Sequence, residues 1–147
     1  MSAPSHSESL TQLDLAHSWF EFVEKGDMDG LASLLSDNLT HHLLPASMEL
    51  PEAMEHPFGK KRHLNVYQNM KRTMDSYNFH PPEDVIQSAD SNTVVIHRTG
   101  NGVTKKGYAY HNEYIFIFKF EGGKIVSIKE FIDVKAFEGV VAATKRQ

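Results

Sequence analysis

The chain contains no cysteine, no excess of basic residues and no long apolar run. Without cysteine among its 147 residues it has no disulfide, no thiolate metal site and no cysteine nucleophile. Its 15 Lys and Arg against 19 Asp and Glu argue against a nucleic-acid partner, since nucleic-acid-binding domains usually present a basic face. The longest fully apolar run, Tyr114 to Phe118, is far shorter than the roughly 18 residues that span a bilayer. We therefore expect neither a nucleic-acid nor a membrane partner.

The N-terminal segment carries no recognisable targeting signal. Residues 1–9 have neither the basic segment nor the apolar segment of a secretory signal peptide. The length fits one domain with one core. We expect a cytoplasmic protein with a disordered tail at residues 1–7 and a single domain over residues 8–147.

The order of the expected elements indicates an α+β fold. Apolar residues recur at helical spacing in the first half of the chain, whereas the second half is typical of strands. We expect helices at residues 8–25, 28–35, 61–77 and 135–144, and strands at residues 38–45, 85–88, 93–99, 104–120 and 124–134. Ser5 and Glu8 have capping-box spacing, and Asn101-Gly102 predicts a hairpin turn. Helices would then cover one face of a curved antiparallel sheet.

Because side chains alternate along a strand, every second residue shares a face, and this assigns the two faces of the last two strands. In the strand before the last, the face rich in aromatic residues is the better candidate for the interior. In the last strand, Ser127 and Lys129 mark an outward face, which also carries Ile125. The opposite, inward face consists of Val126, Ile128, Glu130 and Ile132.

Glu130 is a carboxylate on an otherwise apolar strand face. Desolvation disfavours its charged form and raises its pKa, by up to roughly 3–5 units when burial is complete. A carboxyl group of this kind is a candidate general acid or base at neutral pH. Two structural alternatives stay open: an ion pair with a buried arginine or lysine, or a bulge that turns Glu130 to water.

Nine histidines are unusual for this length, and histidine titrates near neutral pH. His41 and His42 are adjacent on an expected strand and point to opposite faces, so they cannot both bind one metal; sequence alone leaves open which of them faces inward. His97 lies on another expected strand and is a further candidate. The remaining histidines have no assigned chemistry, and we expect most of them to be solvated: His6, His17, His56, His63, His80 and His111.

Two further patterns concern metal ligands and hydrogen-bond donors. His111 and Glu113 share a strand face, as in some iron sites, but that face is the outward one, so we predict no metal site. Tyr108, Tyr110 and Tyr114 lie on the opposite face and would present phenolic donors to a pocket, although core packing explains the same spacing.

Three segments in the C-terminal third resemble one family. Gly107-Tyr-Ala-Tyr-His-Asn-Glu-Tyr114, Gly123-Lys-Ile and Lys129-Glu-Phe-Ile-Asp133 are similar to the SnoaL-like branch of the nuclear-transport-factor-2-like fold. The resemblance implies a cone-shaped barrel of a curved, mostly antiparallel sheet, with helices on its concave face and one deep pocket. It also implies a homodimer formed through the outer sheet face.

Two subgroups of that fold are similar to this chain. The last strand resembles the Arg-Asp-Tyr-Phe-Asp segment of limonene-epoxide hydrolase, which places Glu130 at a catalytic carboxylate position. That family also has an Arg-x-Asp pair, whereas this chain reads His97-Arg98-Thr99-Gly100 and lacks the aspartate. Small fungal isomerases and cyclases of natural-product pathways resemble it more closely, at His42-Leu-Leu-Pro-Ala-Ser-Met48 and at Tyr110-His-Asn-Glu-Tyr114.

We therefore expect a cofactor-independent acid–base enzyme that isomerises, cyclises or rearranges an apolar polycyclic natural-product intermediate. Glu130 would move the proton, with His41 and His97 as catalytic partners. The expected substrate-binding residues are His42, Tyr108, Tyr110, Tyr114, Asn112, Trp19 and Phe116. The alternatives are an epoxide hydrolase or dehydratase of the same fold, and a small-molecule binding protein without catalysis.

Overall fold

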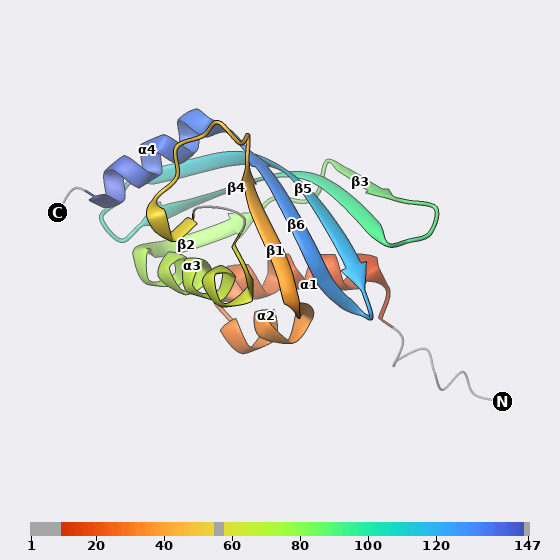
Figure 1. Cartoon of the computed structure of the whole chain (residues 1–147). Helices are drawn as coiled ribbons and strands as arrows, with labels where there is room; N and C mark the ends of the chain where they lie inside the picture. The colour runs from red at the N-terminus through yellow and green to blue at the C-terminus, as the bar shows by residue number, and fades with distance from the viewer. Residues whose placement is uncertain (1–9, 55–57, 146–147) are drawn as a thin grey trace.

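The computed structural model describes residues 10–54 and 58–145, and these residues form an α+β fold, as the sequence predicts (Figure 1). The helices of this described part are α1 (Gln12–Lys25), α2 (Met28–Leu34), the short 3-10 helix η2 (Glu52–Met54), α3 (Lys60–Thr73) and α4 (Val134–Lys145). Its strands are β1 (Leu35–Leu44), β2 (Met74–Phe79), β3 (Asp84–Gln87), β4 (Thr93–Thr104), β5 (Ala109–Glu121) and β6 (Lys124–Ile132). The tail expected at residues 1–7 lies outside the described residues.

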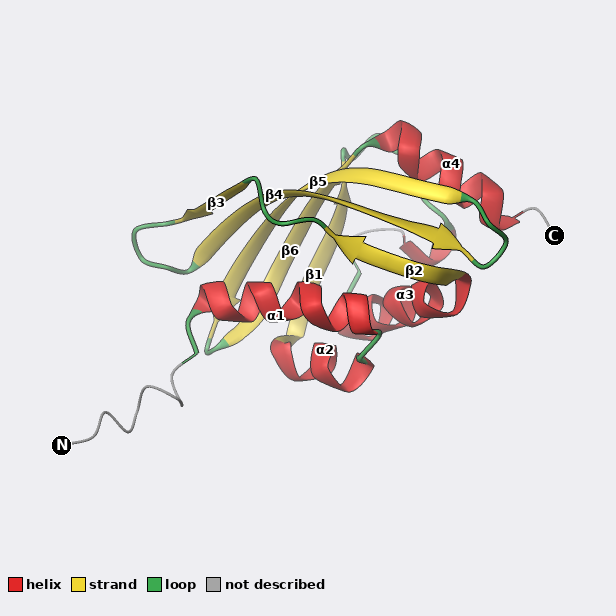
Figure 2. Cartoon of the chain, turned by 180° about the vertical axis from the view of Figure 1, so that it is seen from behind, coloured by secondary structure: helices red, strands yellow, loops and turns green. Residues whose placement is uncertain are grey.

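The strands form one curved sheet in the order β1-β6-β5-β4-β2, and β3 also pairs with β4. The β1–β6 pairing is parallel and the other pairings are antiparallel. The sheet stays open, with β1 and β2 at the two ends of this order, so it is not a closed barrel (Figure 2). Helices α1, α2 and α3 lie on its concave side, and α4 crosses the end of the sheet near β5 (Figure 2). This arrangement leaves the interior between sheet and helices as the place for a site.

Helix α1 begins at Gln12, later than the expected start at residue 8. Thr11 is its N-cap and forms a reciprocal capping box with Asp14, with both backbone-to-side-chain distances at 3.1 Å. These two bonds satisfy backbone donors that the first helical turn leaves without partners. The alternative capping pair, Ser5 and Glu8, lies outside the described residues.

The helix predicted over residues 61–77 is confirmed up to Thr73, but its predicted end and the predicted turn at Asn101-Gly102 are wrong, for one shared reason. Helix α3 ends at Thr73, and the chain continues as β2, which pairs with the second half of β4. Gly102 lies inside β4 opposite Tyr77, and a Cβ atom built there would lie 2.0 Å from the carbonyl oxygen of Ser76. Gly102 thus permits close approach of two strands, and the turn follows at Gly107, whose φ of 91° suits glycine.

The burial pattern confirms most of the predicted strand faces, and the exceptions are at the strand starts, at Tyr108 just before β5 and at Ile125 in β6. Tyr114, Phe116 and Phe118 are buried on β5, and Glu130 is buried on β6. Ile125, expected to face outward, is instead fully buried. The register between β5 and β6 shifts at this point, because Lys119 pairs with Ser127 whereas Phe120 pairs with Ile125. This β-bulge reverses the alternation for the first residues of β6.

The outer face of the sheet is where the resemblance places the dimer contact. Ile115 and Phe131 are register partners on that face, and 43% and 41% of their surfaces are exposed. The homodimer that the resemblance implies would use this face, and it stays a prediction.

Among the helices of the described ranges, none combines the length and the apolar character needed to cross a bilayer.

Replacing Gly102 by Ala should destabilise the protein, because the new methyl group would collide with the backbone of β2. We expect the free energy of unfolding to fall by about 1–3 kcal/mol, the usual cost of overpacking. Chemical denaturation followed by the fluorescence of Trp19, the single tryptophan, measures the change. Gly59→Ala is the control, since a Cβ there meets only Leu39 O at 3.6 Å, and equal stability losses in the two variants would contradict the account.

Candidate active site

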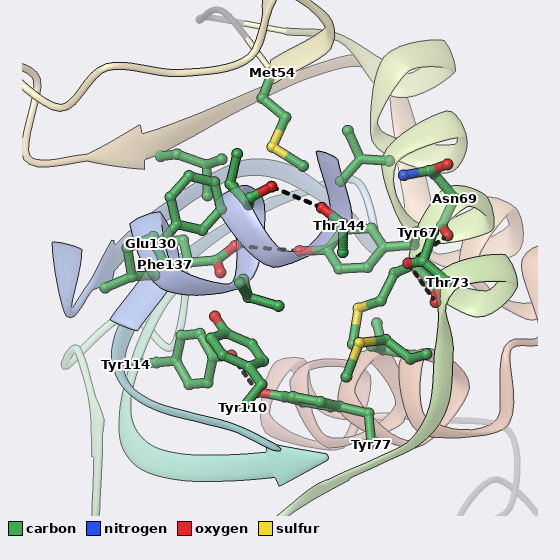
Figure 3. Close-up of a pocket in the computed structure, with 18 of the residues that line it drawn as sticks. Met54, Tyr67, Asn69, Thr73, Tyr77, Tyr110, Tyr114, Glu130, Phe137 and Thr144 are labelled. Atoms are coloured by element: carbon green, nitrogen blue, oxygen red, sulfur yellow. Dashed lines mark hydrogen bonds between the residues drawn. The ribbon is translucent and has the colours of Figure 1, made fainter. Parts of the chain in front are cut away.

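A pocket lies between the concave face of the sheet and helices α1, α3 and α4 (Figure 3). It encloses about 870 Å³ of empty space, counting its open mouth. Most of its wall is apolar, and Trp19 and Phe116 are part of that wall. Its polar lining consists of Tyr67, Asn69, Thr73, Tyr77, Tyr110, Tyr114, Glu130 and Thr144. A mostly apolar cavity with a few converging polar groups is typical of a small-molecule site.

Glu130 projects from β6 into this pocket, and only 7% of its surface is exposed. Two side chains contact the same carboxyl oxygen. His41 Nε2 lies 3.0 Å from Oε1. The Tyr67 hydroxyl donates to Oε1 at 3.2 Å (Figure 3). In the described part of the chain, no lysine or arginine forms an ion pair with Glu130. Both structural alternatives, a cation partner and a bulge that turns Glu130 to water, are therefore wrong.

A chain of buried side chains links Glu130 through two histidines to Trp19, which is itself part of the pocket wall. His41 is the inward member of the His41-His42 pair, which the sequence left open, and it is fully buried. Its other ring nitrogen, Nδ1, lies 2.9 Å from Nδ1 of His63 on α3. The indole Nε1 of Trp19 on α1 donates to Nε2 of His63 at 3.1 Å. Elements from both layers of the fold thus hold this single carboxyl group.

Burial controls the protonation of these groups. Desolvation raises the pKa of Glu130 to about 8, and the Tyr67 hydrogen bond offsets part of this rise. Desolvation, with a contribution from His42, lowers the pKa of His41 to about 3, and desolvation also holds the pKa of His63 well below its usual value. Although His41 and Glu130 are within ion-pair distance, at neutral pH they form a neutral imidazole–carboxylic acid pair.

Three tyrosine hydroxyls gather on the pocket wall near Glu130 (Figure 3). The hydroxyls of Tyr77 and Tyr114 hydrogen-bond to each other, and Asn112 Nδ2 donates to the Tyr110 hydroxyl at 2.6 Å. Burial raises the pKa of Tyr110 to about 12 and the pKa of both other tyrosines above the usual value, so all three stay protonated. Because Tyr110 accepts from Asn112, its own proton is free to serve as a donor.

The structure brings most of the predicted site residues together. Glu130, Trp19, Tyr110, Tyr114 and Phe116 line the pocket, and His41 contacts Glu130 from behind. Asn112 is buried next to Tyr110, and its Oδ1 accepts from the backbone N–H groups of Glu113 and Asp133 at 2.7 and 2.9 Å, which fixes its amide group.

Three predicted site residues lie elsewhere. His97 faces outward on β4, where its Nε2 lies 2.6 Å from Glu113 and its Nδ1 3.4 Å from Asp84, so it does not join Glu130. His42 faces away from His41 on β1, and the half-exposed Tyr108 precedes β5 outside the pocket lining. Among the described residues, no group of three or more His, Asp or Glu side chains is placed to hold a metal ion.

Sequence reasoning missed His63, Tyr67 and Tyr77 as site residues. His63 was expected to be solvated, yet none of its surface is exposed. Its spacing of one helical turn from Tyr67 on α3 is a signal that was present in the sequence, since residues four apart share a helix face. Tyr77 is the last residue of the helix predicted over residues 61–77, and it reaches the pocket from strand β2 instead.

The curved open sheet with helices in its concavity is the nuclear-transport-factor-2-like fold. The chain belongs to the SnoaL-like domain family, whose sequence model matches residues 16–128. No curated protein matches the chain.

Similar solved structures support the same fold. PrhC from Penicillium brasilianum superposes with a TM-score of 0.76 at 16% identity, over 90% of this chain and 89% of PrhC. BvnE pinacolase from Penicillium brevicompactum gives 0.75 at 17% identity, over 95% of this chain and 99% of BvnE. AusH from Aspergillus nidulans gives 0.67 at 20% identity, over 85% and 87% of the two chains. At these identities the likeness shows the fold alone.

The raised pKa of Glu130 makes the stability of the protein depend on pH. The folded state holds this proton more tightly than the unfolded state, so Glu130 lowers the free energy of unfolding as the pH rises from about 5 towards 8. His41 and His63 have lowered pKa values, so their effect is a loss of stability as the pH falls below 6.5. Between pH 6.5 and 8 the free energy of unfolding therefore changes with pH mainly through Glu130, and little through His41 and His63.

We expect the stability of the wild type, measured relative to Glu130→Gln, to fall across pH 6.5–8 by up to about 1.4 kcal/mol per pH unit. Denaturation curves of both proteins at each pH measure this difference, and the outer-face His97 cancels because both proteins contain it. Parallel stability curves for the two proteins would show that Glu130 is ionised in the folded state.

Proposed function

We propose that this protein is an enzyme that isomerises, cyclises or rearranges an apolar polycyclic small molecule by acid–base chemistry without a cofactor. The observation that carries the proposal is a buried, protonated carboxyl group in an apolar pocket, with phenolic donors on the neighbouring wall. BvnE, a similar structure, is named a pinacolase. The SnoaL-like family is consistent with such an activity.

In the proposed mechanism Glu130 donates and later recovers the proton. With a pKa of about 8 it is mainly a carboxylic acid at neutral pH, and its conjugate base is strong enough to remove a proton later in the cycle. The hydroxyls of Tyr110 and of the Tyr77–Tyr114 pair would donate to a substrate oxygen on which negative charge develops. The apolar wall would hold the carbon skeleton in a reactive conformation.

Hydrolysis of an epoxide is the second candidate reaction, and the pocket offers less for it. A paired-carboxylate mechanism needs a second acid to activate water, and Glu130 is the one carboxylate in the described lining. Arg98, two residues before Gly100 at the aspartate position of the Arg-x-Asp pattern, donates to the backbone oxygen of His80. Its guanidinium also stacks on Phe20, 4.6 Å from the ring centroid. Arg98 is therefore occupied in packing between β4, α1 and β2, and it does not line the pocket.

Replacing Glu130 by Gln should abolish turnover and preserve the fold, because Gln matches the neutral acid in shape and keeps an oxygen acceptor for His41 and Tyr67. We expect a loss of about 100-fold or more, the range for removal of a general acid or base. A panel of polycyclic enones, epoxides and vicinal diols, followed by mass spectrometry in oxygen-18 water, measures turnover and reaction type. Glu113→Gln, on the outer face of β5, is the matched control.

The mass of the product separates the candidate functions. A product of unchanged mass supports isomerisation or rearrangement of an enone or epoxide, and a gain of labelled water supports hydrolysis. Loss of water from a vicinal diol fits both a dehydratase and a pinacol-type rearrangement, and the carbon skeleton of the product distinguishes these two. Binding of a panel compound by the wild type, with no conversion and with equal affinity in Glu130→Gln, would mean a binding protein and would overturn the proposal.

Replacing Tyr110 by Phe should slow the reaction with little effect on substrate binding. Loss of one donor to a developing negative charge typically costs about 100-fold in kcat or more. Steady-state kinetics on the substrate found above separates kcat from KM, and Tyr108→Phe is the control because Tyr108 lies outside the pocket lining. An unchanged kcat in Tyr110→Phe would remove the tyrosine group from the mechanism.

A further inference from the structure

The chain of contacts behind Glu130 has a direction that its chemistry determines. It runs from Trp19 on α1 through His63 on α3 and His41 on β1 to Glu130 on β6, with distances of 3.1, 2.9 and 3.0 Å. Trp19, His63 and His41 have no exposed surface, so water does not substitute for any of their partners. Each link in this chain therefore decides the proton position in the next.

Trp19 sets the direction because an indole N–H only donates. Nε2 of His63 must accept this bond, so the single proton of a neutral His63 sits on Nδ1. That Nδ1–H group donates to Nδ1 of His41, which must therefore carry its proton on Nε2. The Nε2–H group of His41 in turn donates to Oε1 of Glu130. Every N–H bond in the chain points towards the carboxyl group.

The same arrangement prevents His41 from accepting a second proton. The free position on His41 is Nδ1, and the N–H group of His63 already points at it from 2.9 Å. His63 cannot move its proton to Nε2, because the indole N–H of Trp19 occupies that side. A doubly protonated His41 would place two N–H groups against each other in a buried space, where lost hydrogen bonds are costly.

We propose that Trp19 and His63 are positioning residues that lock His41 as a permanent donor to Oε1, so that Glu130 exchanges its proton only through Oε2 and never with His41. No donor from the described residues lies on Oε2. The titratable groups facing Glu130 are His41 from β1, Tyr67 from α3, Tyr77 from β2, and Tyr110 and Tyr114 from β5. None of these phenols takes up a proton from Glu130. With His41 locked as a donor, Glu130 therefore exchanges its proton only with molecules in the pocket.

This lock deepens the proposed function and, in its consequence for the reaction, rests on it. When Glu130 acts as an acid, the Oε2–H bond breaks as a bond from hydrogen to substrate forms, and the electron pair stays on the carboxylate. The carboxylate must then recover a proton from the bound molecule, whose bonding electrons remain in the product. A reaction that returns the proton in this way is neutral in protons, as an isomerisation or the rearrangement of an epoxide is.

The test reads the proton positions in the ligand-free protein, so it does not depend on a substrate. Nitrogen-15 NMR of histidine-labelled wild type distinguishes the two neutral tautomers and the charged form of each ring. We expect neutral His41 with its proton on Nε2 and neutral His63 with its proton on Nδ1 from pH 5 to 8. A proton on Nδ1 of His41 anywhere in this range would overturn the lock, whether or not the enzyme proposal stands.

Two variants release the lock in different ways. Trp19→Phe removes the N–H donor, and His63→Gln provides an amide oxygen that accepts from Nδ1 of His41. In either variant His41 should become protonated as Glu130 ionises, and carbon-13 NMR of the Glu130 carboxyl should show its pKa lower by about one to three units. The control, Phe118→Leu, removes a buried ring next to Trp19 and should change neither reading. Unchanged tautomers and Glu130 pKa in the folded variants would overturn the proposal.

Discussion

The rest of the site depends on the desolvation of one carboxyl group that has no cation beside it. A buried carboxylate is stable only when it is paired, and the groups that touch Glu130 are a neutral imidazole and a neutral phenol. The carboxyl group therefore keeps its proton at neutral pH. Both donors converge on Oε1, which leaves Oε2 for chemistry in the pocket.

This constraint explains why residues from distant parts of the chain meet here. Strand β1 pairs in parallel with β6 and brings His41 beside Glu130, while α3 supplies Tyr67 and His63 from the facing layer. Trp19 closes the chain from α1 and packs edge-on against Tyr67, with 5.3 Å between ring centroids. The proton donor thus rests on rigid elements, as a preorganised site requires. The tyrosines occupy strands β2 and β5, so acid and oxygen-binding groups come from different strands.

Strand alternation was sufficient to place Glu130, because β6 is regular from Ile128 to Ile132 and its two faces differ in polarity. It failed at Ile125, where a bulge shifts the register. It also failed at His97, because the apolar run Val94-Val95-Ile96 before it places apolar side chains on both faces of β4. A glycine signal was read as a turn at Gly102 although it permits close strand approach. The burial of His63 was not predicted because its hydrogen-bond partners are distant in the sequence. Trp19 is 44 residues away and His41 is 22 residues away.

Neutron diffraction from a crystal of the ligand-free wild type near neutral pH tests the central claim most directly, because it locates the exchangeable protons. The account predicts a proton on Oε2 of Glu130, one on Nε2 of His41 and one on Nδ1 of His63, with Nδ1 of His41 bare. An ionised Glu130 facing a doubly protonated His41 would contradict it.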